Sequence, residues 1–172
     1  SRRPLISTKV GRLIRPGVRE GNELYGDRQP FYLANPDKRF IFDFSYDGVL
    51  RSHEESLQRL GVDAVDILHI HDSDEHFTDA VQGAYQALNR LRDEGSVKAV
   101  SAGMNQWEML SKFLDHGDFD CFLLAGRYTL LDQSSLAELL PKCLKHGTSI
   151  VIGGVYNSGI LANPVPGTTY NY

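Results

Sequence analysis

Short apolar segments alternate with amphipathic, helix-like segments along most of the chain, and this alternation restricts the fold more than any other feature. From residue 65 onward the apolar segments begin at intervals of roughly 24 to 32 residues, which is typical of repeated strand–helix units in a parallel sheet. We therefore expect an α/β protein with strands at residues 5–9, 65–71, 97–102, 121–125 and 149–152.

Helix signals occupy the segments between these strands. Ser45 is a suitable N-cap and Gly61 a suitable stop, and the helix between them places on one side Leu50, His53, Leu57 and Leu60. Further helices are expected at residues 78–94, 106–116 and 134–146. The first of these has an apolar stripe at helical spacing, made of Val81, Ala84, Leu88 and Leu91.

The segment from about residue 13 to residue 44 fits neither pattern. Proline and glycine interrupt it repeatedly, and it carries many aromatic side chains, namely Tyr25, Phe31, Tyr32, Phe40, Phe42 and Phe44. Loops of this length inside a compact domain are uncommon and are usually functional or disordered. We expect a long irregular, aromatic-rich loop that packs over another part of the protein.

No strand is followed by the Gly-x-Gly-x-x-Gly pattern of a dinucleotide-binding doubly wound sheet. A parallel (β/α)8 TIM barrel is the better architecture, although a closed barrel typically takes ~250 residues. This sequence of 172 residues contains about five βα units. Residues 1–172 are therefore expected to form a single partial β/α-barrel domain, with further strands before Ser1 and after Tyr172.

Composition and charge exclude several classes of partner. The net charge is -4 and basic residues form no stripe, so nothing favours binding to nucleic acid or to an anionic membrane. No segment has the ~20 consecutive apolar residues of a membrane span, and we expect a cytoplasmic protein. Cys121 and Cys143 have the spacing of neither a zinc site nor a redox pair, so both are expected to be buried, reduced thiols.

The strand at residues 65–71 ends with two histidines, His69 and His71, followed by Asp72. Alternate side chains of a strand share a face, so both imidazoles point the same way. Three interpretations are open at this point: a metal site of the His-x-His kind, a single working histidine at the rim of a barrel, or a structural histidine in the core. Asp72 either binds a substrate hydroxyl or belongs to a solvated acidic turn.

Other strands also end in candidate site residues. Lys9 and Asn105 follow two of them, and the last strand leads into Tyr156, Asn157, Ser158 and Gly159. Because the carboxyl ends of parallel strands meet at one edge of a sheet, these residues are expected at the same rim. Trp107 either lines this site or packs in the core. A desolvated barrel lysine could also be a Schiff-base nucleophile, which makes an aldolase a rival class.

A barrel metallohydrolase would need histidines at other strand ends as well. His53 falls within a predicted helix, and His116 and His146 fall at helix ends. A metallohydrolase that uses His69 and His71 is therefore only a lesser alternative, and we expect no metal.

Taken together, the strand ends and their flanking segments resemble the aldo-keto reductases, which are β/α barrels that use a nicotinamide cofactor. The resemblance rests on residues 7–12 (STKVGR), 43–61, the strand that ends at His71, 103–106 (GMNQ), 127–133 (RYTLLDQ) and 154–159 (GVYNSG). These motifs occur in the family's order and cover nearly the whole chain. They are most similar to the sugar dehydrogenase branch of the family, which oxidises aldoses such as L-fucose, L-galactose or D-threo-aldoses.

The resemblance implies a role for each strand-end residue. Lys9 matches the lysine beside the family's catalytic tyrosine, and His71 matches the histidine that orients the substrate carbonyl. Asn105 is expected to hydrogen-bond the nicotinamide carboxamide, Tyr156 to stack on its ring, and the pyrophosphate to lie near Asn157, Ser158 and Gly159. The family's catalytic tyrosine and its aspartate partner come from a strand end before Lys9, and this chain lacks both.

The complete protein is accordingly expected to be an NAD(P)-dependent oxidoreductase that transfers hydride between NADP or NAD and an aldehyde, ketone or aldose. Asp72 and Trp107 are the candidate contacts for this small-molecule substrate. The segment that would bind an adenosine 2′-phosphate follows the last strand, so the choice between NADP and NAD stays open. A non-catalytic relative that binds the cofactor in a regulatory role is the alternative from a different class.

Overall fold

The computed structural model describes residues 3–19, 37–168 and 170. Its main sheet has five parallel strands in the order β1-β4-β5-β6-β7. These strands are β1 (Ser7–Val10), β4 (Ile67–His71), β5 (Ala99–Met104), β6 (Cys121–Ala125) and β7 (Ser149–Gly153). The sequence expectation of a partial β/α barrel with about five units is therefore confirmed for the described residues.

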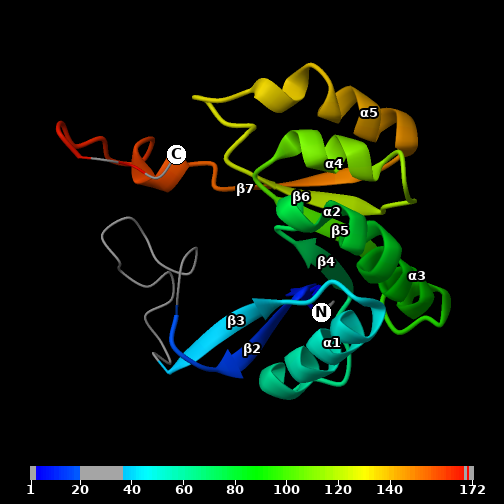
Figure 1. Cartoon of the computed structure of the whole chain (residues 1–172). Coiled ribbons are helices and arrows are strands. Elements are labelled where there is room, and N and C mark those ends of the chain that lie inside the picture. The colour runs from blue at the N-terminus through cyan, green and yellow to red at the C-terminus, as the bar shows by residue number, and fades with distance from the viewer. Residues whose placement is uncertain (1–2, 20–36, 169, 171–172) are drawn as a thin grey trace.

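Helices lie along one side of this sheet, as Figure 1 shows. They are α1 (Tyr46–Leu60), α2 (Phe77–Asp79), α3 (Tyr85–Asp93), α4 (Trp107–Phe113) and α5 (Leu139–His146). Shorter helical turns are η2 (Asp74–His76), the π-helical η3 (Ala80–Ala84), η4 (Ser134–Leu136) and η5 (Asn157–Gly159). Because each helix follows a strand and covers the same side, the sheet is built as in a β/α barrel.

The two faces of the sheet differ in their side chains. Leu68, Ile70 and Val100 point toward the helices and are fully buried in the core. The opposite face, which we call the inner face, carries a row of register partners: Lys9, His69, Ser101, Cys121 and Ser149. One step further along the strands the inner face carries His71, Gly103, Leu123 and Val151. Val151 is 47% exposed, so this face is less covered than the helix side.

Asp66 joins three strands at their amino ends. Its buried carboxylate accepts a hydrogen bond from Ile6 N at 2.9 Å and lies 2.8 Å from Lys98 Nζ and 3.0 Å from an Arg3 nitrogen. The Lys98 hydrogen bond, followed by the backbone bond from Ile6, holds the pKa of Asp66 below its usual range. The charge that interrupts the apolar run before His69 is thus a structural anchor.

The first helix begins and ends as its sequence predicts. Ser45 Oγ accepts a hydrogen bond from Gly48 N at 3.1 Å, and Gly61 ends α1 in the left-handed conformation with φ 66°. The predicted buried side is partly wrong, because Leu60 is 50% exposed and the buried side chains are Val49, Ser52, His53 and Ser56. Leu50 and Leu57 are half-buried and still pack against the core, so the buried side of α1 is shifted by about one residue from the leucine stripe.

The expected irregular loop at residues 13–44 is wrong at both ends. Strand β2 (Arg12–Pro16) pairs antiparallel with β3 (Lys38–Phe42), and together they form a hairpin beside the main sheet (Figure 1). Leu13 is 5% exposed and Ile14 is 43% exposed, which is the alternation of a half-buried strand. The many prolines and glycines of the segment favoured a loop in the prediction instead. The middle of the segment, with Tyr25, Phe31 and Tyr32, lies outside the described residues.

Both cysteines are buried free thiols, as predicted. Cys121 lies on the inner face beside Ser101, whereas Cys143 on α5 packs into the core on the helix side. Within the described part of the chain, no helix has the length and apolar character needed to cross a membrane.

Candidate active site

His71 is the last residue of β4, and it stands at the rim of the sheet. Its side chain is 21% exposed, and its Nε2 lies 3.3 Å from Oδ2 of Asp72. Lys9 near the end of β1 pairs in register with His69, so the lysine and both histidines share the inner face. The pairing of β1 with β4 therefore brings together Lys9 and His71, which are far apart in the sequence.

His69 lies one step below His71 and has a partner in the sheet. Its Nδ1 is 2.7 Å from the hydroxyl of Ser101 on β5, in a buried hydrogen bond. Burial is the main reason that the pKa of His69 falls to about 4, and the positive charge of Lys9 adds to the effect. His69 is thus a neutral, buried histidine, and one of its ring nitrogens is already occupied.

His71 is also neutral across the physiological pH range. Burial lowers its pKa to about 3, and Arg12, Lys9 and His69 contribute in that order. A neutral imidazole has one N–H donor and one acceptor nitrogen. It can therefore donate a hydrogen bond to a carbonyl oxygen without carrying a charge of its own.

Asp72 follows His71 in a backbone conformation that is rare for residues with a side chain. Its φ is 43°, and its N–H donates to Gly103 O at 3.0 Å, which fixes the turn to the neighbouring strand β5. Its carboxylate forms an ion pair with Arg12 of β2. Burial raises the pKa of Asp72, while the nearby Arg12 opposes this shift. A strained, partly buried carboxylate at a strand end is typical of a functional position.

A pocket adjoins this turn on the side of the hairpin. Its volume is about 200 Å³, and its lining residues are Arg12, Phe40, Phe42, Asp72, Asp74, Glu75 and His76. The ring centroids of Phe42 and His76 lie 5.1 Å apart, so these two rings form one wall of the pocket. The pocket thus combines aromatic surface with carboxylates and one guanidinium, next to the imidazole of His71.

The residues expected beside the nicotinamide lie after β5. Asn105 directly follows the strand and is partly buried. Trp107 begins α4 and packs against the hydrophobic core, which supports its structural interpretation more than a role as a pocket wall.

The expected pyrophosphate turn follows β7, at the other edge of the sheet from Lys9. Asn157, Ser158 and Gly159 are successive left-handed residues, with φ values of 46°, 55° and 100°. Asn157 is 4% exposed, and its Oδ1 has no hydrogen-bond partner among the described residues. Tyr156 is 62% exposed. A buried amide oxygen without a partner and a strained turn at a strand end fit a position where a polar cofactor approaches the backbone.

The structure therefore forms two groups at one rim. Lys9, His71 and Asp72 are neighbours, while Tyr156 and the η5 turn follow β7 at the other edge of the sheet. Two residues were not recognised as site residues from the sequence: Ser101, the partner of His69, and Arg12, the partner of Asp72. The only available signal for Arg12 was a charged residue directly after Gly11, in a motif that already contained Lys9.

The metal interpretation of the two histidines gains no support. Across residues 3–19, 37–168 and 170, no group of three or more His, Cys, Asp or Glu side chains could hold a metal ion.

This fold is that of a known class of barrel. The chain belongs to the aldo/keto reductase family, whose sequence model matches residues 1–166. It is 43% identical to pyridoxal 4-dehydrogenase of Microbacterium luteolum, over 94% of this chain and 52% of the relative. It is 39% identical to D-threo-aldose 1-dehydrogenase of a Pseudomonas species, over 94% of this chain and 49% of the relative. The chain thus spans about half the length of the curated relatives it matches.

Solved structures agree on the fold. An aldo-keto reductase of Bacillus halodurans in its holo form matches with a TM-score of 0.69 and 20% identity, over 98% of this chain and 49% of its own. A glycerol dehydrogenase of Gluconobacter oxydans matches with a TM-score of 0.68 and 20% identity, over 96% of this chain and 45% of its own. At this level of identity the likeness shows the (β/α)8 barrel architecture, of which the described sheet is a part.

Proposed function

We propose that the full-length protein is an NAD(P)-dependent oxidoreductase that transfers hydride between nicotinamide and an aldehyde, ketone or aldose. The observation that carries the proposal is the placement of Lys9 beside a neutral His71 at the rim of the sheet. An aldose is the preferred substrate, because one of the relatives is named a D-threo-aldose 1-dehydrogenase and the adjoining pocket offers carboxylates for hydroxyl groups. The cofactor is NADP or NAD.

Each residue of the rim has a chemical task in this reaction. His71 donates a hydrogen bond from its neutral ring to the substrate oxygen and so orients and polarises the carbonyl. Lys9 supplies a positive charge beside the substrate oxygen, which gains a proton in reduction and loses one in oxidation. In the complete protein this proton would be exchanged with the tyrosine that the family resemblance puts on a strand before Lys9. Asp72 accepts a hydrogen bond from a substrate hydroxyl.

The cofactor would be held by residues after β5 and β7. Asn105 would bind the nicotinamide carboxamide, Tyr156 would lie against the ring, and the phosphates would meet the turn formed by Asn157, Ser158 and Gly159. The left-handed backbone of Asn157, Ser158 and Gly159 supports this assignment, because such a turn lets a ligand approach main-chain atoms closely. When bound, nicotinamide accepts or supplies the hydride.

The first test is turnover by the full-length protein with NAD or NADP and a panel of pyridoxal, D-threo-aldoses, L-galactose and methylglyoxal. We expect aldose-dependent formation of reduced cofactor, and a fall in kcat of ~10²- to 10⁴-fold in both Lys9→Met and His71→Phe variants. Lys145→Met, which removes an exposed lysine on α5, is the matched control and should keep wild-type turnover.

Two outcomes would contradict the proposal. Cofactor binding without turnover of any substrate would point instead to a non-catalytic regulatory protein. Loss of activity on adding a chelator, with recovery on adding metal, would indicate a metal-dependent reaction.

A further inference from the structure

The charged end of Arg12 is fixed by the hairpin. Its guanidinium carbon lies 4.9 Å from the ring centroid of Phe40 and 5.2 Å from that of Phe42, both on β3. Contacts with two aromatic rings hold a planar guanidinium in place and favour its positive charge. The side chain is only 17% exposed, and its Nε is buried with no hydrogen-bond partner in the described part of the chain.

The backbone turn at Gly11 places the guanidinium of Arg12 next to Asp72. Gly11, which precedes Arg12, has φ 99°, and a Cβ there would come within 2.1 Å of the Phe44 ring. Only glycine fits this turn, which directs the chain from β1 into β2 directly after Lys9. A terminal nitrogen of Arg12 then pairs with Oδ2 of Asp72, the same oxygen that lies 3.3 Å from Nε2 of His71.

One carboxylate oxygen therefore has two possible cationic partners. Without Arg12, an unpaired carboxylate at 3.3 Å would favour the imidazolium form of His71. That imidazolium would pair with Asp72, and its Nε2–H would be directed away from a substrate. The guanidinium satisfies the carboxylate and adds positive charge near the ring, and both effects disfavour protonation of His71.

We propose that Arg12 is a positioning residue: by pairing with Asp72, it keeps the imidazole of His71 neutral and its Nε2 available to the substrate oxygen. The inference rests on the proposed role of His71 in substrate binding. It assigns the β2–β3 hairpin a part in the active site, because Phe40 and Phe42 hold the guanidinium.

The positive charges around His71 all disfavour its protonation. The lowered pKa of His71 follows first from burial and then from Arg12. On β5 its register partner is Gly103, which carries no charge. The charged and titratable groups that face it are Lys9 on β1, Arg12 on β2, His69 on β4 and Asp72 after β4. Asp72 is the one anion in this set, and its pairing with Arg12 offsets the one charge that would favour protonation of a ring already disfavoured from protonation by burial.

The test is a pH titration of the histidine rings by NMR in the full-length protein, with the His71 signal assigned by its loss in His71→Asn. In the wild type, we expect His71 not to titrate above pH ~5. In Arg12→Met its pKa should rise by ~2 units, and the acidic limb of kcat/KM should move up in pH by the same amount. Asp72→Asn added to Arg12→Met should reverse the rise, since it removes the carboxylate.

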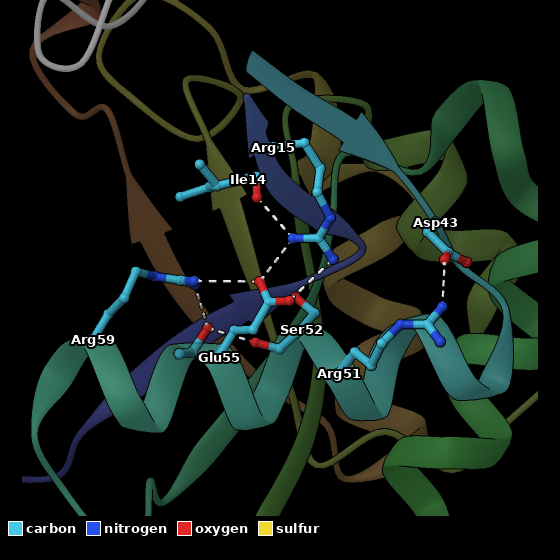
Figure 2. A network of polar contacts seen from close by, with 8 residues as sticks. Ile14, Arg15, Asp43, Arg51, Ser52, Glu55 and Arg59 are labelled. Carbon is cyan, nitrogen blue, oxygen red and sulfur yellow. Dashed lines mark hydrogen bonds and ion pairs between the residues drawn. The ribbon is translucent and has the colours of Figure 1, made fainter. Parts of the chain in front are cut away.

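Arg15→Met is the matched control, because it removes the same charge from the same strand. Arg15 pairs with Glu55 of α1 through nitrogen–oxygen distances of 3.0 and 3.1 Å (Figure 2), and it is not among the charges that shift the pKa of His71. Its His71 titration should match the wild type. If Arg12→Met does not fold, Arg12→Gln keeps a polar side chain without the charge. The pKa of His71 should rise in this variant as well.

A pKa of His71 that stays low in the Arg12 variants, or that rises equally in Arg15→Met, would overturn the inference. The titration needs no turnover, so it is independent of the activity assay. Absence of turnover in the wild type contradicts the proposed function, whereas an unmoved titration in an active enzyme contradicts only the role of Arg12.

Discussion

Two histidines two residues apart on one strand have different environments. His69 is 3% exposed and bound to Ser101, while His71 is at the rim with its Nε2 near Asp72. Neutral burial of His69 has a cost at low pH, because the unfolded chain binds a proton at its ordinary pKa of ~6.5 and the folded protein does not. The free energy of unfolding is therefore unaffected by the protonation of this histidine above pH ~6.5. It decreases as the pH falls from ~6.5 toward 4, because only the unfolded chain takes up the proton.

Replacing His69 by leucine should therefore change stability in opposite directions at two pH values. At pH 7 the variant should be less stable by ~1 kcal/mol, since the hydrogen bond with Ser101 is lost. At pH 4.5 it should be more stable than the wild type, because the wild type has lost ~2 kcal/mol to protonation of the unfolded state. Urea unfolding at both pH values measures the difference. A variant that is less stable by the same amount at both would show that His69 does not titrate differently on folding.

The adjacency of Lys9 and His71 could be predicted from the sequence, because both end apolar strands and parallel strands present their ends at one edge. The contribution of Arg12 could not. Its place depends on the turn at Gly11 and on rings of β3 more than 25 positions along the chain, as the β2–β3 register shows. No local pattern around Arg12 identifies Phe40 and Phe42 as its neighbours.

At the scale of elements, the helix predicted at residues 78–94 has a feature that its apolar periodicity does not predict. Ala84, Leu88 and Leu91 are buried as the stripe predicts. The helix nevertheless contains the π-helical turn η3 (Ala80–Ala84), which an apolar stripe alone does not reveal. Gly83 lies in this turn, and a Cβ there would come within 2.4 Å of Phe44 O and 3.0 Å of Ser45 Cα. The missing side chain allows the helix to approach the backbone that leads into α1.

Gly83→Ala should consequently destabilise the protein by ~1–3 kcal/mol, although alanine is the better helix former. The neighbouring exposed Gln82→Ala is the matched control, and it should leave the free energy of unfolding nearly unchanged. Chemical unfolding of both variants checks this expectation. Stabilisation by Gly83→Ala would show that the close approach is absent in solution.

At the scale of the whole molecule, the two faces of the sheet differ in cover. The helix-side residues of the central strands β4, β5 and β6 are at most 2% exposed, whereas Val151 on the inner face is 47% exposed. The order of strands and the side of the helices followed from the strand–helix alternation. The hairpin did not, because its strands are short and separated by residues 17–37.

The two thiols should report this difference. Burial raises the pKa of Cys121, and it raises that of Cys143 to about 11, so both should react slowly in the folded chain. We expect Cys121, on the inner face, to label roughly tenfold faster than Cys143, on the buried side of α5, in the 172-residue chain. Single Cys121→Ser and Cys143→Ser variants resolve the two rates, and both thiols should react equally fast in denaturant. Faster labelling of Cys143 would mean that the helix layer opens first.

The row of register partners across the inner face also has a consequence for folding. Lys9, His69 and Ser101 stand at one level on three strands, while Leu68 and Val100 face the apolar helix side. A slip of one residue in β1 or β4 would turn Lys9 or His69 into the apolar layer, at the full cost of burying an unpaired polar group. The polar side chains of the inner face therefore disfavour misaligned pairing of these strands.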